Sequence, residues 1–84
     1  MISCSEYDAI EIVCMFKYPI EITKRSGDVI QGIALDTKLN EQREECIQLV
    51  VKGKPEQVEL IVLTDILKLL VCVNNPHFQN VKFN

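Results

Sequence analysis

The chain has 84 residues, of which 48% are hydrophobic and 25% are charged, and its formal net charge is −3. This length fits a single domain, residues 1–84, whose core is large enough to fold without an obligatory metal or disulfide. The acidic balance argues against binding to the phosphate backbone of nucleic acids, because clustered Lys and Arg supply most of that affinity.

No segment of the sequence has the pattern of a membrane span or a secretory signal. The most apolar run, Val58–Val73, is interrupted by charged residues and is short for crossing a bilayer. The opening MISCSEYD lacks the basic region and the long apolar stretch of a signal peptide. We therefore expect a cytoplasmic protein without membrane contact.

The cysteines do not follow a metal-binding pattern. No CxxC spacing occurs, and the only histidine is His77, so the sequence fits no zinc site and we expect no metal and no cofactor. An even number of cysteines allows a disulfide framework, but nothing in the sequence indicates an oxidising compartment. We expect buried free thiols, at Cys4, Cys14, Cys46 and Cys72.

The segment Ser3–Phe16 (SCSEYDAIEIVCMF) has the pattern of a short amphipathic helix, with its body over about residues 5–16. Ser5 is expected to cap its start, and Asp8 to complete a capping box. At about 100° per residue, one side is an apolar arc of Ala9, Ile10, Val13, Cys14 and Phe16. The remaining arc holds Tyr7, Asp8, Glu11 and Met15. Because so short a helix is marginal alone in water, the apolar arc is expected to dock and the other arc to form an exposed working surface.

After the helix, short runs of alternating apolar residues predict five strands within about residues 18–83. They are Tyr18–Lys24, Val29–Leu35, Cys46–Val51, Glu56–Leu63 and Ile66–Val73, and Val81–Phe83 is a candidate for a further edge strand. Tight turns are expected around Gly27 and Gly53, and Gly32 inside a strand predicts a bend or a close backbone approach. A helix over Leu63–Val73 is the competing interpretation, because Leu and Lys favour helices.

The segment Asp36–Glu45 (DTKLNEQREE) is polar and has no apolar period, so we expect the longest exposed loop there. One helix followed by five short, hairpin-linked strands predicts an α+β fold that is mainly β. Closure or covering removes exposed strand edges, which favours a strongly bent antiparallel sheet or barrel.

This order of elements resembles the Sm-like fold. Within Ser26–Asp36 (SGDVIQGIALD), a turn glycine, a strand glycine five residues later and a final acidic residue resemble the first half of the Sm signature. The N-terminal stretch is more specific, because it resembles the opening of the Rof family of Rho-binding antiterminators. Its matching pattern is Ile2-x-Cys4-x-x-Tyr7-Asp8-x-Ile10-Glu11-x-x-Cys14. The resemblance continues to about Phe83.

The resemblance implies a small Sm-like protein that inhibits the transcription-termination factor Rho, a hexameric RNA-dependent helicase. Members of the family occupy the primary RNA-binding region in the N-terminal OB-fold domain of Rho, so that Rho does not load on transcripts. The family's helix supplies aromatic and acidic contacts, which fall here on Tyr7, Asp8 and Glu11. Met15 shares their arc of the helix. The loop after the second strand also contacts Rho in the family, and in this longer loop the candidate residues are Glu41, Arg43, Glu44 and Glu45.

Two other function classes remain open at this point. Fold analogy alone would allow an Sm-like module that binds RNA or forms oligomers without a Rho role. For an enzyme, the paired carboxylates would lie on an exposed helix rather than in a cleft, so we expect no catalytic residues. The resemblance implies a protein that binds Rho without direct contact to nucleic acid, and we expect a monomer.

Overall fold

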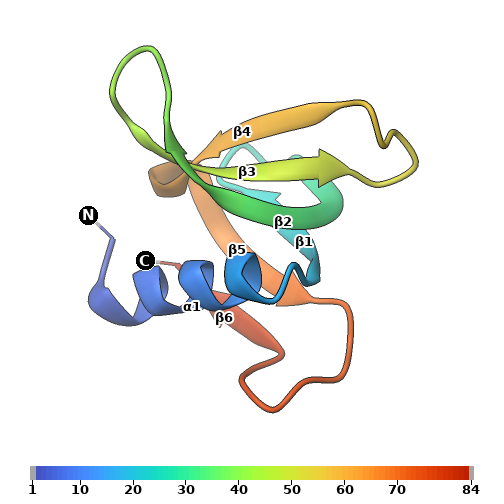
Figure 1. Cartoon of the computed structure of the whole chain (residues 1–84). Coiled ribbons are helices and arrows are strands. Elements are labelled where there is room, and N and C mark those ends of the chain that lie inside the picture. The colour runs from blue at the N-terminus through green and yellow to red at the C-terminus, as the bar shows by residue number, and fades with distance from the viewer. Residues whose placement is uncertain (1, 84) are drawn as a thin grey trace.

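A computed structural model describes residues 2–83 of the chain (Figure 1). The helix α1 (Cys4–Met15) precedes six strands and a 3-10 helix, η1 (Leu63–Asp65). The strands are β1 (Pro19–Lys24), β2 (Val29–Leu39), β3 (Glu45–Val51), β4 (Val58–Val62), β5 (Ile66–Val71) and β6 (Asn80–Lys82). The predicted α+β, mainly β architecture is confirmed, and the sixth strand corresponds to the candidate edge strand near the C-terminus.

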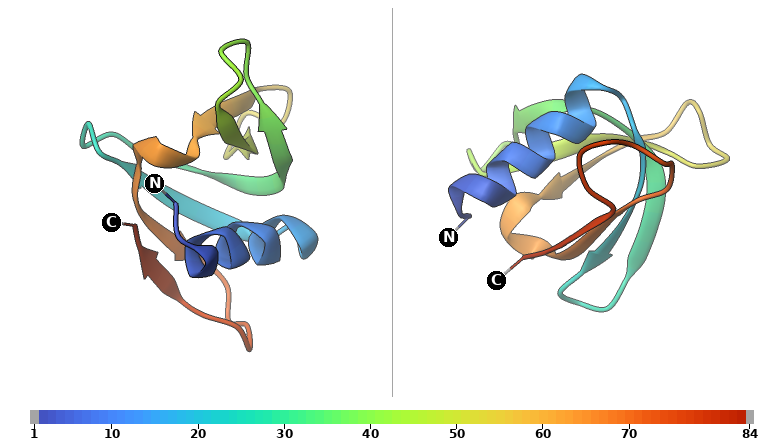
Figure 2. Two further views of the ribbon diagram at one scale, coloured as in Figure 1. Left: turned by 90° about the vertical axis from the view of Figure 1, so that its left-hand side faces the viewer. Right: turned by 90° about the horizontal axis from the view of Figure 1, so that it is seen from below.

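The strands form one antiparallel sheet in the order β4-β3-β2-β1-β5-β6. The sheet is strongly curved, and α1 lies along one side of it (Figure 2). Within residues 2–83, β4 and β6 are the two outer strands and each has one strand neighbour. The sheet is therefore open at these edges, where the sequence had suggested a barrel.

The curvature has two local causes in β1 and β2. The strand register shifts between Thr23 and Lys24 and again between Ala34 and Asp36, and such bulges increase local bending and twist. Between these shifts, a Cβ atom at Gly32 would lie 2.1 Å from the carbonyl oxygen of Val50. The predicted close backbone approach at Gly32 is thus confirmed, and only glycine fits there.

The core lies between α1 and the inner side of the sheet. Helix α1 contributes Ile10 and Val13, both fully buried, and packs most closely against β2. Phe83, after β6, is also part of the core. The sheet and η1 contribute Ile20, Ile22, Ala34, Ile47, Leu49, Ile61, Leu63, Ile66, Leu69 and Val71. Arg25 ties η1 to the C-terminal end, because its guanidinium donates to the carbonyl oxygens of Thr64 and Phe83 at 3.0 and 3.2 Å.

The start of α1 differs from the prediction. Ser3, not Ser5, is the N-cap, and Glu6, not Asp8, completes the capping box. The Ser3 hydroxyl accepts from the Glu6 N–H at 3.2 Å, and the Glu6 carboxylate accepts from the Ser3 N–H at 2.9 Å. Both Ser-x-x-acid spacings occur in the sequence, but the longer Glu side chain reaches back to the cap backbone, as this motif requires.

The end of α1 also differs. Phe16 was assigned to the buried arc, yet it is the C-cap residue and is 49% exposed. Lys17 follows with a positive φ of 53°, and the N–H groups of Lys17 and Tyr18 donate to the carbonyls of Cys14 and Val13. This pair of bonds ends the helix as a Schellman motif, and it turns the Phe16 ring away from the core.

The predicted loop over Asp36–Glu45 is wrong in its length. Strand β2 continues to Leu39, where it pairs with Glu45 of β3, so that only residues 40–44 form the connection. The side chains of this extension are exposed on both faces, so the sequence shows no alternation of apolar and polar residues there. Backbone pairing with β3 stabilises the extension instead. The longest connection is instead residues 72–79, between β5 and β6.

Two strand boundaries and one alternative are also corrected. Strand β4 is shorter than the predicted Glu56–Leu63, and β5 ends at Val71 rather than at Val73. The helix considered for Leu63–Val73 is wrong, because only the single turn η1 is helical there. In the described part of the chain, neither helix has the length and the apolar character that a bilayer span requires.

Candidate functional site

The predicted working surface lies on the exposed side of α1. Asp8 and Glu11 are exposed, and Met15 is 70% exposed one turn beyond Glu11. The opposite side of the helix is buried in the core through Ala9, Ile10, Val13 and Cys14. Because residues three and four apart on a helix are neighbours, the side chains of Asp8, Glu11 and Met15 form one continuous ridge.

Tyr7 lies beside this ridge and connects it to the sheet. Its ring packs against the core, and its hydroxyl donates a hydrogen bond to the carboxylate of Glu45, the first residue of β3. This hydrogen bond raises the pKa of Tyr7 above its ordinary value, with smaller contributions from burial and from the Glu45 charge. The phenol is therefore a fixed, neutral group at one flank of the ridge.

A cavity of about 320 Å³ opens next to Tyr7. It is lined by Ile2, Tyr7, Glu44, Glu45, Val62, Leu63 and Thr64. A second cavity, of about 360 Å³, lies at the other end of the ridge, where Glu11 and Met15 face Leu35, Asp36 and Thr37 of β2. Lys17 lines this cavity as well, and its ammonium group donates to the carbonyl of Leu35 at 3.0 Å.

The loop residues that were named as candidates divide into two groups. Glu44 and Glu45 share the cavity beside Tyr7. Glu41 and Arg43 are exposed in the connection 40–44, and this connection projects away from α1 (Figure 1). Asn40 holds it, because the Asn40 side-chain oxygen accepts from two backbone N–H groups of the connection, each at 2.9 Å.

An aromatic cluster at the end of α1 was missed by the sequence analysis. The ring centroids of Phe16 and Tyr18 are 5.4 Å apart, and those of Phe16 and His77 are 4.9 Å apart. Pro19 could have indicated only that the helix ends before it, and so that Phe16 lies outside the helical projection. The contact with His77 has no such signal in the sequence.

The four thiols lie in two different environments. Among residues 2–83, no group of three or more His, Cys, Asp or Glu side chains could hold a metal ion. All four cysteines are free, but Cys4 and Cys72 are exposed, so their predicted burial is wrong. Burial raises the pKa of the Cys14 thiol to about 11, aided by the Asp36 charge, and burial also raises the pKa of Cys46. Thiols with raised pKa values are poor nucleophiles.

Comparisons with known proteins agree with this architecture. A family model described as modulator of Rho-dependent transcription termination (ROF) matches residues 1–83. The solved structure of YaeO bound to magnesium, from Vibrio cholerae O395, superposes with a TM-score of 0.86 at 35% sequence identity. That match covers 93% of this chain and 97% of the YaeO chain. A search among curated proteins gave no significant match. The chain belongs to the ROF family of modulators of Rho-dependent transcription termination.

Proposed function

We propose that this protein inhibits Rho-dependent termination by binding the RNA-binding region of the N-terminal OB-fold domain of Rho. The exposed ridge of α1 would occupy that region, so that RNA cannot load. The observation that carries the proposal is the ridge itself, where Asp8 and Glu11 lie exposed and Tyr7 is held beside them by Glu45.

The chemistry of the ridge suits a site that normally binds RNA. Such sites use Lys and Arg to meet phosphates and aromatic rings to stack bases. The Cβ atoms of residues three apart on a helix are about 5–6 Å from each other. Asp8 and Glu11 can therefore reach one basic cluster together, through charge-assisted and bidentate hydrogen bonds to Arg.

The anchoring of the surface reduces the entropy lost on binding. Tyr7 is fixed by the Glu45 carboxylate, and Lys17 fixes the end of α1 to the carbonyl of Leu35. Groups that are already held in place lose less freedom when the complex forms. Glu44 adds negative charge near Tyr7, and such charges at the rim speed association at low salt.

The test is a titration of Rho with this protein, in which RNA binding and RNA-stimulated ATPase activity are measured at two salt concentrations. We expect inhibition that is relieved by added RNA and weakened by salt. Asp8→Lys should lower the affinity for Rho at least about thirtyfold, because it places a cation against the basic site.

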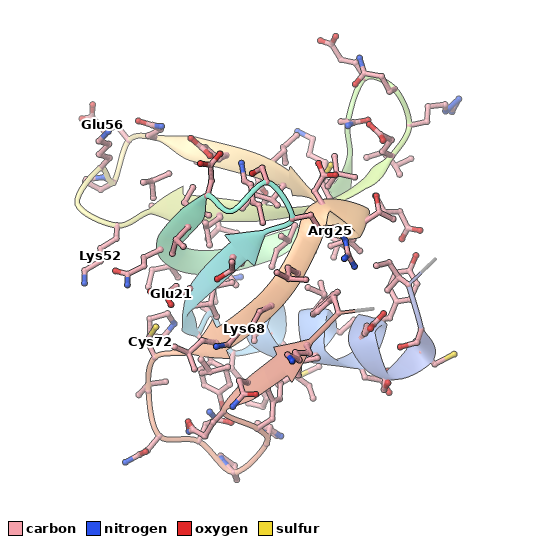
Figure 3. All side chains as sticks on the ribbon, turned by 180° about the vertical axis from the view of Figure 1, so that it is seen from behind. Glu21, Arg25, Lys52, Glu56, Lys68 and Cys72 are labelled. Carbon is pink, nitrogen blue, oxygen red and sulfur yellow. The ribbon has the colours of Figure 1, made fainter. Side chains whose placement is uncertain are left out.

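The matched control is Glu56→Lys. It makes the same change of charge in the hairpin between β3 and β4, which lies on the far side of the molecule from α1 (Figure 3). Equal affinities of the two variants, with unchanged circular dichroism, would exclude the ridge as the binding surface.

We further propose that the protein acts as a monomer without contacting RNA itself. A shifted band with oligo-U or oligo-A at low salt would instead favour an RNA-binding module.

A further inference from the structure

The ridge of α1 ends in a large exposed apolar surface. Met15 is 70% exposed and the next residue, Phe16, is 49% exposed. Apolar surface left in water raises the free energy of the folded protein. Met15 lies one turn beyond Glu11, and Phe16 follows it as the C-cap of α1. The helix that carries Asp8 and Glu11 therefore ends in two exposed apolar side chains.

The Phe16 ring is held by neighbours from two other parts of the chain. Tyr18 stacks on it at an interplanar angle of 19°, and His77 packs against it at 30°. His77 comes from the connection 72–79, and Asn75 holds that connection in place. The Asn75 side-chain oxygen accepts from the N–H groups of His77 and Phe78, and its amide donates to the carbonyls of Val73 and Phe78.

The two neighbouring rings cover Phe16 only in part. The third separation, between the centroids of Tyr18 and His77, is 6.3 Å, so the three rings form a compact triangle. The two neighbours leave Phe16 49% exposed, so part of its surface is accessible to a partner.

We propose that Phe16 is a specificity-determining contact of the partner-binding surface, and that it stacks on an aromatic side chain that otherwise stacks a nucleobase. This inference rests on the proposed function. Carboxylates can replace the phosphates of RNA, but a site that binds RNA also presents aromatic rings, and these need a flat apolar group. Phe16 offers such a group, packed against Tyr18 and His77, at the C-terminal end of the helix that carries Asp8 and Glu11.

The test measures association and dissociation rates of Rho binding for three variants, by a surface-immobilised binding assay at low and high salt. Phe16→Ala should weaken binding about 5- to 150-fold, the range of alanine substitutions at base-stacking rings. Since stacking is not ionic, we expect the same factor at both salt concentrations, mainly in the dissociation rate. Phe16→Tyr keeps the ring and should bind like the wild type. Val58→Ala is the control, because Val58 is 46% exposed in β4, away from α1.

The results for Phe16 and Asp8 separate this inference from the proposed function. If Asp8→Lys abolishes binding and Phe16→Ala binds within twofold of the wild type, the role of Phe16 is wrong and the acidic ridge stands. A loss for Phe16→Ala that shrinks at high salt, or that Val58→Ala reproduces, also overturns the role of Phe16. If the wild type does not bind Rho at all, both proposals fall together.

Discussion

Tyr7 joins two parts of the chain that are 38 residues apart in sequence, through its hydrogen bond to Glu45. The neutral phenol donates this hydrogen bond to a carboxylate, and loss of the phenol proton would place two negative charges together. The raised pKa of Tyr7 is the measurable consequence of that contact.

The contact predicts the titration of a single tyrosine. The chain has two tyrosines, so Tyr18→Phe leaves Tyr7 as the only phenol. In this background we expect the pKa of Tyr7, followed by phenolate absorbance, to lie above 10.0. Glu45→Ala should lower it, because the hydrogen bond and the charge are both removed. Glu44→Ala removes an equal charge from the neighbouring position and should lower the pKa less. Equal effects of the two variants would contradict a specific bond to Glu45.

At the scale of the element, the start of α1 depends on which serine caps it. Ser3→Ala should lower the free energy of unfolding by about 1 kcal/mol, because the N–H of Glu6 loses its acceptor. Ser5→Ala is the matched control, since Ser5 is exposed in the first turn, and alanine favours helices there. Urea denaturation of both variants measures the difference. A larger loss for Ser5→Ala would show that the helix begins two residues later than in this structure.

The sequence predicted the elements better than their ends. Apolar spacing was sufficient for α1 and for the strands that reach the core, because burial imposes a period on those residues. It failed for Thr37 and Lys38, which extend β2 by pairing with β3 outside the core. It also failed for the cap, where Ser3 and Ser5 both precede an acidic residue at the same spacing.

For the candidate site, the same spacing placed Asp8 and Glu11 together on the exposed side of α1, because a helical projection needs only local geometry. The partnership of Tyr7 with Glu45 could not be predicted, since it depends on where β3 begins relative to α1. The cluster of Phe16 with His77 depends in the same way on the path of residues 72–79. Contacts between elements require the assembled fold.

At the scale of the whole molecule, the core contains two thiols on different elements. Cys14 of α1 is 7% exposed, and Cys46 of β3 is fully buried. A thiolate at either place would lose its hydration, so folding favours the protonated form of both. The stability of the fold is thereby linked to alkaline pH.

We expect the protein to lose stability as the pH rises from about 9 to about 11. The pKa of the Cys14 thiol is about 11 in the folded chain against an ordinary value of 9.0, so the unfolded chain releases its proton first. The contribution of Cys14 is complete below the lower value, and about 2 kcal/mol is lost by the upper one. Cys46 acts in the same direction.

Urea denaturation under reducing conditions measures this alkaline fall in the free energy of unfolding. Cys14→Ala should be less stable at neutral pH, because packing is lost, but should show a shallower alkaline fall. Cys72→Ala, which removes an exposed thiol, should keep the full fall. An equally steep fall in Cys14→Ala would assign the alkaline transition to other groups.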